Sequence, residues 1–175
     1  MDSSIYLRVA KILGVTGSAW LGGNIAGLSL LVTPALRHSS TDDGVSSSTI
    51  SKQWRYIYES GKAQNPPIAA VAAVAYLYLA WTARGLAPTS QLPLYYGSAA
   101  VLTLGIVPFT LIAMSSTNNK LMRHSEALSK NPSASLQPSS DQEVDELVAR
   151  WTVLNGIRSL FPLTGAILGV VAILG

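Results

Sequence analysis

The chain has 175 residues, of which 49% are hydrophobic and only 12% are charged, and its mean hydropathy is +0.34. The charged fraction is about half the usual share in soluble domains, so the composition indicates a membrane protein. The chain has no cysteine, which excludes a disulfide framework and a thiolate metal site. A net charge of +3 without a dense basic run argues against a nucleic-acid partner.

Four apolar segments are long enough to cross a bilayer, which needs roughly 20 apolar residues. The first is uncharged from Ile12 to Leu36 and is longer than the apolar region of a secretory signal, so we expect it to be retained. The sequence therefore predicts an all-α fold, an integral membrane four-helix bundle that forms a single domain over residues 1–175. The expected spans are residues 12–36, 66–83, 94–114 and 151–175.

Small residues, prolines and aromatic residues mark details of these spans. Gly23 and Gly27 form a pair that lets another helix approach closely, and such glycine-rich faces also suit a homo-oligomer. Pro34 and Arg37 are predicted to end the first span, and Pro108 is predicted to kink the third. A belt of interfacial aromatic residues is expected at one membrane surface, formed by Tyr76, Tyr78, Trp81, Tyr95 and Tyr96.

Two long loops are expected on one side of the membrane, at residues 38–65 and 115–150. In the first, residues 38–49 are predicted to be irregular, and residues 50–63 have the spacing of an amphipathic helix that lies at the interface. The second contains a turn-rich stretch at residues 131–140. Asp141 then suits the first turn of the fourth helix.

The basic residues predict the orientation in the membrane. Four spans place both long loops on one side, and both termini and the 84–93 turn on the other. The positive-inside rule places both long loops in the cytosol, and we expect the endoplasmic reticulum membrane to hold the protein. The loop side carries eight basic residues, Arg37, Lys52, Arg55, Lys62, Lys120, Arg123, Lys130 and Arg150, and the opposite side three, Arg8, Lys11 and Arg84.

The fourth span carries one polar stripe. Trp151, Asn155, Arg158 and Pro162 lie at i, i+4, i+7 and i+11, which is one face of a helix. An arginine inside an apolar helix is costly, so we expect Arg158 to face the bundle interior or a wet cavity. Two alternatives stay open: Arg158 extends to the interface, or Asn155 only bonds another helix.

The expected topology gathers aromatic and amide residues at the cytosolic end of the bundle. We predict a pocket there, with Arg158 at its floor, for a flat and mostly apolar ligand that carries a phenol or carbonyl. Alternatively, Trp54, Tyr58 and Trp151 are interfacial anchors and His124 is a surface residue. His38 is expected to be exposed. The residues of this predicted pocket are Trp54, Tyr58, Asn65, Asn118, His124, Trp151, Asn155 and Arg158.

Three motifs resemble one family. They are Val107-Pro-Phe-Thr-Leu111 leading to Thr117-Asn-Asn-Lys-Leu121, Trp151-x-x-x-Asn155-x-x-Arg158-x-x-x-Pro162-x-x-Gly165, and Trp54-x-x-x-Tyr58-x-x-Gly61 before Pro66-Pro67. With these motifs, its length and its four spans, the whole chain is similar to the anthrone oxygenases, small fungal membrane proteins with a domain once described as being of unknown function.

The resemblance implies an oxygenase of polyketide pathways that converts an anthrone to the anthraquinone with dioxygen as co-substrate. Such enzymes insert one oxygen atom at the central methylene carbon and release water, and the family is described as needing no flavin, haem or added metal. The implied partners are a small aromatic polyketide and membrane lipid.

The expected chemistry assigns hypothetical roles. Arg158 holds the developing oxyanion, with Asn155 and Asn118 as further donors. His124 is the preferred general base, with Tyr58 or Glu59 as alternatives. Substrate contacts are expected from Trp54, Tyr58, Trp151 and Asn65.

Two further interpretations remain. The chain is a non-catalytic membrane scaffold or a bundle that binds lipids or aromatic ligands, or it is a metal- or haem-dependent oxidase that uses His38 or His124 as a ligand.

Overall fold

The computed structural model describes residues 3–85, 90–130 and 138–175, and within these ranges the ordered elements are helices without a strand. Four continuous helical stretches are long and apolar enough to cross a membrane, which confirms the predicted four-span all-α architecture. They cover Ser4–Thr41, Ser47–Ala83, Leu92–Ala127 and Asp141–Leu174, so each is longer than the predicted span.

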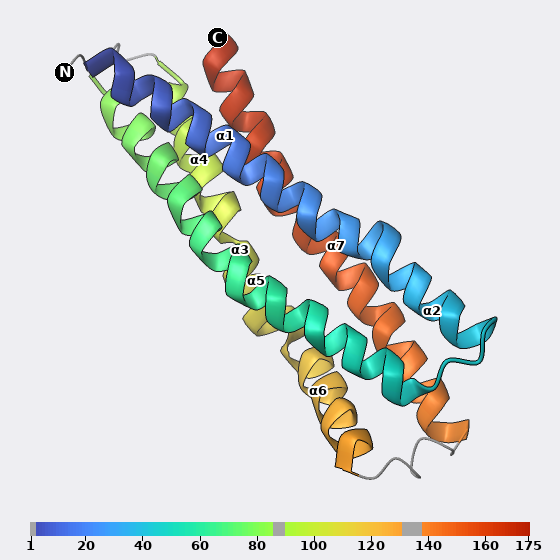
Figure 1. Cartoon of the computed structure of the whole chain (residues 1–175). Helices are drawn as coiled ribbons and strands as arrows, with labels where there is room; N and C mark the ends of the chain where they lie inside the picture. The colour runs from blue at the N-terminus through green and yellow to red at the C-terminus, as the bar shows by residue number, and fades with distance from the viewer. Residues whose placement is uncertain (1–2, 86–89, 131–137) are drawn as a thin grey trace. The chain divides into compact units, whose positions relative to one another are not determined.

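The first span consists of α1 (Ser3–Gly27), a π-helical turn η1 (Leu28–Val32) and α2 (Thr33–Thr41). The helix does not end at Pro34 or Arg37 but continues to Thr41 (Figure 1), and the predicted end of the membrane span at these residues stays a prediction. Pro34 has no N–H to donate within the helix. The backbone widens just before it, where the Thr33 N–H bonds the Leu28 carbonyl, and π turns of this kind let a helix accommodate a proline.

The second span is a single helix, α3 (Ser47–Ala83), drawn as one unbroken ribbon in Figure 1. The predicted amphipathic segment at residues 50–63 is helical, but it is the first part of α3 rather than a separate element. Pro66 and Pro67 lie inside the helix. Because proline has no N–H, the carbonyls of Lys62 and Ala63 lose their usual helical hydrogen bonds. All four residues are exposed, so water or lipid headgroups can bond these two carbonyls.

The prediction that residues 38–49 are irregular is wrong for most of that stretch. Only residues 42–46 lie between α2 and α3, and Ser47 already begins the helix. Ser46 supports this start, because its side-chain Oγ accepts a hydrogen bond from the Thr49 N–H at 3.4 Å. Serine at this position satisfies one of the backbone N–H groups that every helix start leaves unbonded.

The third span changes its helical geometry on both sides of Pro108, and the predicted kink at Pro108 stays a prediction. It consists of α4 (Leu92–Leu104), α5 (Ile106–Phe109), a π-helical turn η2 (Thr110–Met114) and α6 (Ser115–Lys130). Pro108 has no N–H to donate to the Leu104 carbonyl. Between α4 and α5, the backbone N–H of Gly105 donates to the carbonyls of both Val101 and Leu102, each at 2.9 Å.

The second predicted long loop is mostly helical. Residues 115–130 extend the third span as α6, and α7 (Pro138–Leu174) begins before Asp141, which lies in its first turn as predicted. Of the turn-rich stretch predicted at residues 131–140, residues 131–137 lie outside the described residues. Residues 138–140 are helical.

The chain divides into two compact units. Unit 1 consists of Met1–Asn24, Gln64–Pro108 and Arg158–Gly175, and unit 2 of Ile25–Ala63 and Phe109–Ile157. Each unit receives a segment from all four spans, so neither unit corresponds to a continuous part of the sequence. The expectation of a single domain stays a prediction.

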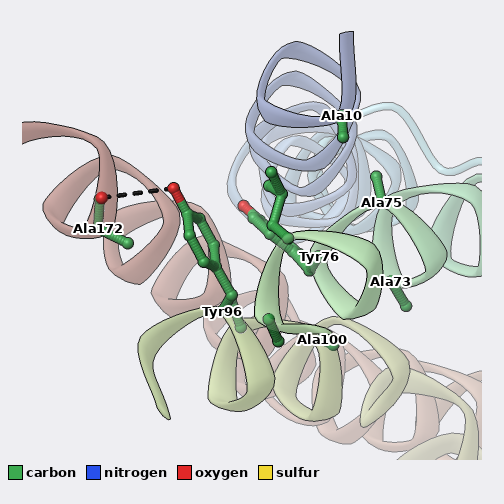
Figure 2. Close-up of a cluster of buried hydrophobic side chains, with 10 residues drawn as sticks. Ala10, Ala73, Ala75, Tyr76, Tyr96, Ala100 and Ala172 are labelled. Atoms are coloured by element: carbon green, nitrogen blue, oxygen red, sulfur yellow. Dashed lines mark hydrogen bonds between the residues drawn. The ribbon is translucent and has the colours of Figure 1, made fainter. Parts of the chain in front are cut away.

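The core of unit 1 is built from two tyrosines among alanines (Figure 2). Tyr76 and Tyr96 are almost completely buried, with ring centroids 6.3 Å apart. Their assignment to an interfacial belt is therefore wrong, although Tyr78 and Trp81 are exposed. The Tyr96 hydroxyl donates to the Ala172 carbonyl at 3.3 Å, as Figure 2 shows.

The Tyr76 hydroxyl is also fully bonded. It lies 2.9 Å from the Ser18 hydroxyl and donates to the Gly165 carbonyl at 3.2 Å. Through these contacts Tyr76, on α3, joins α1 to α7 within unit 1. A buried phenol needs such partners, because leaving it unbonded in an apolar interior costs about 1–3 kcal/mol.

Glycines make room for these contacts at positions that differ from the predicted pair. A Cβ at Gly14 or Gly169 would lie within 3 Å of the Tyr76 ring. At Gly23 and Gly27 a Cβ would meet no atom within 4 Å among the described residues, so the close packing predicted for that pair is wrong within the chain.

We predict that Gly165→Ala lowers the melting temperature of the purified protein in detergent by several degrees. The added Cβ would lie 2.8 Å from Thr103 Oγ1 and 3.0 Å from the Ala99 carbonyl oxygen, so the two helices have to move apart. Gly23→Ala is the matched control and is expected to melt like the parent or slightly higher, because alanine favours helix by about 1 kcal/mol. Equal melting of the two variants would contradict this packing.

Candidate functional site

Most of the predicted site residues lie in unit 2, on three helices. Trp54 and Tyr58 come from α3, Asn118 and His124 from α6, and Trp151 and Asn155 from α7. Asn65 and Arg158 belong to unit 1.

The two tryptophans form the centre of unit 2. Trp54 and Trp151 are 0% and 1% exposed, and their rings meet edge to face with centroids 6.0 Å apart. Tyr58, one turn after Trp54, stacks on it at 5.2 Å with an interplanar angle of 10°. The alternative in which both tryptophans are interfacial anchors is therefore excluded. The buried residues around them are Ile50, Met114, Leu121, Val144, Leu147 and Val148.

The inward face of α6 brings polar groups into the same core. Met114 and Leu121 are fully buried members of it, and Thr117 and Asn118 lie between them at helical spacing, 1% and 3% exposed. Sequence reasoning selected Asn118 but missed Thr117, whose place on the same face was the available signal.

Several buried polar atoms of unit 2 make no hydrogen bond to any described residue. They include two donors, Trp54 Nε1 and Trp151 Nε1, and two side-chain oxygens, Thr117 Oγ1 and Asn118 Oδ1. Ser47 Oγ, at the first residue of α3, is another. Burying such a group without a hydrogen bond costs about 1–3 kcal/mol, and native proteins rarely accept this cost without a ligand or water that binds the group.

Asn155, by contrast, uses both of its amide hydrogens. Its Nδ2 donates to the Ile25 carbonyl and to Ser29 Oγ, each at 2.8 Å. One turn earlier on α7, the hydroxyls of Thr152 and Thr33 are hydrogen-bonded at 2.7 Å. These bonds match the interpretation in which Asn155 connects helices within the membrane.

A salt bridge that sequence reasoning missed holds the same helices together. Arg37 donates to Asp145 through Nε at 2.7 Å and through Nη2 at 2.8 Å, a paired geometry that joins α2 to α7. Both side chains are partly exposed, so the pair contributes orientation more than stability. Sequence reasoning had treated Arg37 only as a loop-side charge that ends the first span.

His124 lies beside a carboxylate. Its Nε2 is 3.3 Å from Glu143 Oε2, and the imidazole is 22% exposed. The His38 side chain is 78% exposed, as predicted, and its Nδ1 lies 3.4 Å from Asp42 Oδ2. Within the described ranges, no three His, Asp or Glu side chains gather in a way that suits a metal ion.

The other predicted bases are placed differently. Tyr58 is half-buried against Trp54. Glu59 is 51% exposed and accepts a hydrogen bond from Arg55 Nε at 2.8 Å.

The polar stripe of α7 faces inward. Trp151, Asn155 and Pro162 are buried, and Arg158 is partly buried with its Nε shielded from solvent. In unit 1, Asn65 is 3% exposed and its Oδ1 accepts a hydrogen bond from Asn24 Nδ2 at 3.1 Å. The Nδ2 of Asn65 has no partner in the part of the chain that the structure describes.

A separate hollow in unit 1 carries none of the predicted site residues. It is an open groove of about 670 Å³ between α1 and α3, and it is almost entirely apolar. Because it lies on membrane-spanning helices, lipid chains suit its chemistry. It is lined by Tyr6, Val9, Ala10, Leu13, Ala70, Val71, Val74, Ala75 and Tyr78.

The fold and the site together define a four-span membrane protein with a polar, aromatic cluster inside the bundle. The family model described as anthrone oxygenase matches residues 54–168. That segment includes all eight residues of the predicted pocket, from Trp54 to Arg158. The chain belongs to the anthrone oxygenase family.

Relatives with assigned names match nearly the whole chain. The anthrone oxygenase encC of Aspergillus fumigatus is 42% identical over 170 residues, which is 94% of this chain and 92% of that protein. The anthrone oxygenase ptaC of Pestalotiopsis fici is 34% identical, covering 82% and 96%. The noranthrone monooxygenase of Aspergillus flavus is 32% identical, covering 99% and 80%. No solved structure matches the chain.

We predict that Asn155→Ala lowers the stability of the fold. The change removes two donors and leaves the Ile25 carbonyl and the Ser29 hydroxyl without those bonds, at a cost of about 1–2 kcal/mol. Thermal unfolding in detergent measures this loss. Asn119→Ala, which removes an exposed amide from α6, is the control. If Asn155→Ala melts like the control, the amide does not hold the helices together.

Proposed function

We propose that this protein is a membrane-bound oxygenase that converts a polyketide anthrone to the anthraquinone with dioxygen. The observation that carries the proposal is the match to the anthrone oxygenase family over the segment that holds all of the predicted site residues. The names of the relatives, which match over most of the chain, support the same substrate class.

The reaction balances without an added reductant. Loss of a methylene proton gives the anthrolate anion, which passes one electron to dioxygen, and the resulting radical and superoxide join through a new carbon–oxygen bond. The peroxide anion takes a proton. Removal of the second methylene proton then breaks the oxygen–oxygen bond, forms the ketone and releases hydroxide, which becomes water. The methylene carbon gives up all the electrons that dioxygen needs, so we propose that no flavin, haem or metal takes part.

We propose His124 as the general base. The Glu143 carboxylate, with Oε2 3.3 Å from Nε2, can orient the imidazole for this role. The partial exposure of the imidazole allows the proton to leave to water. Glu59 stays the alternative base, although its carboxylate is already engaged by Arg55.

The developing oxyanion needs hydrogen-bond donors and positive charge. On chemical grounds we propose the guanidinium of Arg158 for this role, because its charge is permanent and its planar group binds oxygen through two N–H donors. Asn118 is a further proposed contact, and so is Asn65, whose buried amide nitrogen has no partner among the described residues. Asn155 is proposed to act by positioning α7, because both of its amide hydrogens are already bonded.

The four spans support a location in a membrane. Four helices long and apolar enough to cross a bilayer support a membrane protein. We propose that the membrane is that of the endoplasmic reticulum. We also propose that residues 38–65 and 115–150 face the cytosol, because these segments carry most of the Lys and Arg residues.

We predict that the purified protein accelerates the oxidation of a hydroxylated anthrone well above its spontaneous rate in air. The measurement follows oxygen uptake and quinone absorbance, together with metal analysis and an absorption spectrum of the active preparation. A rate equal to autoxidation would support the scaffold interpretation instead. A haem band, or iron or copper in stoichiometric amount, would contradict the cofactor-free reaction.

We also predict that Arg158→Lys lowers kcat by roughly 10²-fold, because lysine keeps the charge but loses the planar pair of donors. Arg150→Lys is the matched control on the same helix, since Arg150 is exposed. Both variants are expected to express and melt like the parent. A normal rate for Arg158→Lys would show that the guanidinium does not hold the oxyanion.

A further inference from the structure

We propose that the indole N–H groups of Trp54 and Trp151 bind the ketone oxygen of the substrate, and that Thr117 and Asn118 accept hydrogen bonds from its phenolic hydroxyls. The inference rests on the proposed function and narrows the substrate class to hydroxylated anthrones. It gives the two tryptophans a role beyond ring stacking.

The first observation is the pair of unpartnered donors. An indole can only donate, through Nε1, and both Trp54 Nε1 and Trp151 Nε1 are buried without an acceptor among the described residues. Neither ring is exposed to bulk solvent, since the side chains are 0% and 1% exposed. Phenylalanine or leucine would fill such a core without this cost.

The second observation is that oxygens of opposite character lie in the same core. Asn118 Oδ1 can only accept a hydrogen bond, Thr117 Oγ1 can accept one, and both are buried without a partner among the described residues. They lie on α6 between Met114 and Leu121, which belong to the same packed cluster as both tryptophans. The donors and the acceptors do not satisfy one another, so each set suits a complementary group on a ligand.

The third observation concerns the neighbouring amide. Asn155 lies one turn after Trp151 on α7, but its two hydrogens are bonded to Ile25 and Ser29. The Asn155 amide is therefore already engaged, whereas the two indole N–H groups are not.

The chemistry of an anthrone fits this arrangement. When the methylene carbon loses its proton, the negative charge moves through the conjugated rings to the ketone oxygen opposite. Two neutral N–H donors in an apolar core bind that anion more strongly than the neutral ketone, and so favour the proton transfer. Phenolic hydroxyls next to the ketone are donors, which is what the oxygens of Thr117 and Asn118 need.

The sharpest test removes only the N–H. Benzothienylalanine, which has sulfur in place of the indole N–H, is introduced at position 54 or 151 by codon suppression, with Trp20 and Trp81 as exposed control positions. At 54 or 151 we expect kcat to fall by roughly 10²-fold. The melting temperature should stay level or rise, because an unpartnered donor has been removed. The pH at which bound substrate ionises, followed by the absorbance of the anthrolate, should also rise.

Unchanged turnover and unchanged ionisation of the bound substrate at both positions would overturn the proposal. A lower melting temperature with unchanged turnover per folded molecule would also overturn it, because the N–H groups would then have a structural role. If the parent protein does not oxidise anthrones, the proposed function fails separately, and calorimetric binding of a hydroxyanthraquinone to the parent and to the substituted proteins still tests the indole site.

The acceptor side is tested by substrate choice. Asn118→Leu and Thr117→Val are assayed with a hydroxylated anthrone and with unsubstituted anthrone, and Asn119→Leu on the exposed face of α6 is the control. We expect the preference for the hydroxylated substrate, measured as a ratio of kcat/KM values, to fall by about 10-fold for each variant and to stay unchanged for the control. A preference that both variants retain in full would refute the assignment of these oxygens.

Discussion

The structure depends on the need to satisfy polar groups inside helices that are otherwise apolar. In unit 1 the hydroxyls of Tyr76 and Tyr96 bond the backbone carbonyls of Gly165 and Ala172. In unit 2 the amide of Asn155 bonds α1 and η1, and Arg37 pairs with Asp145. Because a transmembrane helix gains little from burying apolar side chains away from lipid, such bonds and close packing at small residues fix the arrangement of helices within each unit.

The same requirement is not met in the core of unit 2, where we propose that the substrate binds. Trp54, Trp151, Thr117 and Asn118 are buried in one core with polar atoms that bond no described residue. A bound hydroxylated anthrone would complete the hydrogen bonds of this core, whereas the helices around it are held by bonds that need no ligand. The proposed enzyme therefore separates positioning groups such as Asn155 from groups that bind substrate.

Much of the fold could be predicted from the sequence, because hydrophobic length and helical spacing are local signals. The four spans and the inward stripe from Trp151 to Pro162 followed from them. The same signals did not predict that the helices continue through Pro34 and Pro66, because a helix can accommodate a proline through a π turn or through exposed carbonyls. The burial of Tyr76 and the pairing of Arg37 with Asp145 depend on which helices become neighbours, and a single sequence does not contain that information.

The most direct measurement of the central claim is the ¹⁵N–¹H NMR spectrum of the four tryptophan indoles in detergent, recorded before and after addition of a hydroxyanthraquinone product. The account predicts that the N–H signals of Trp54 and Trp151 move strongly downfield as they form hydrogen bonds, and that those of Trp20 and Trp81, which are exposed, hardly move. If the ligand binds and the two buried signals keep their positions, the indole groups do not hold the substrate and the account is contradicted.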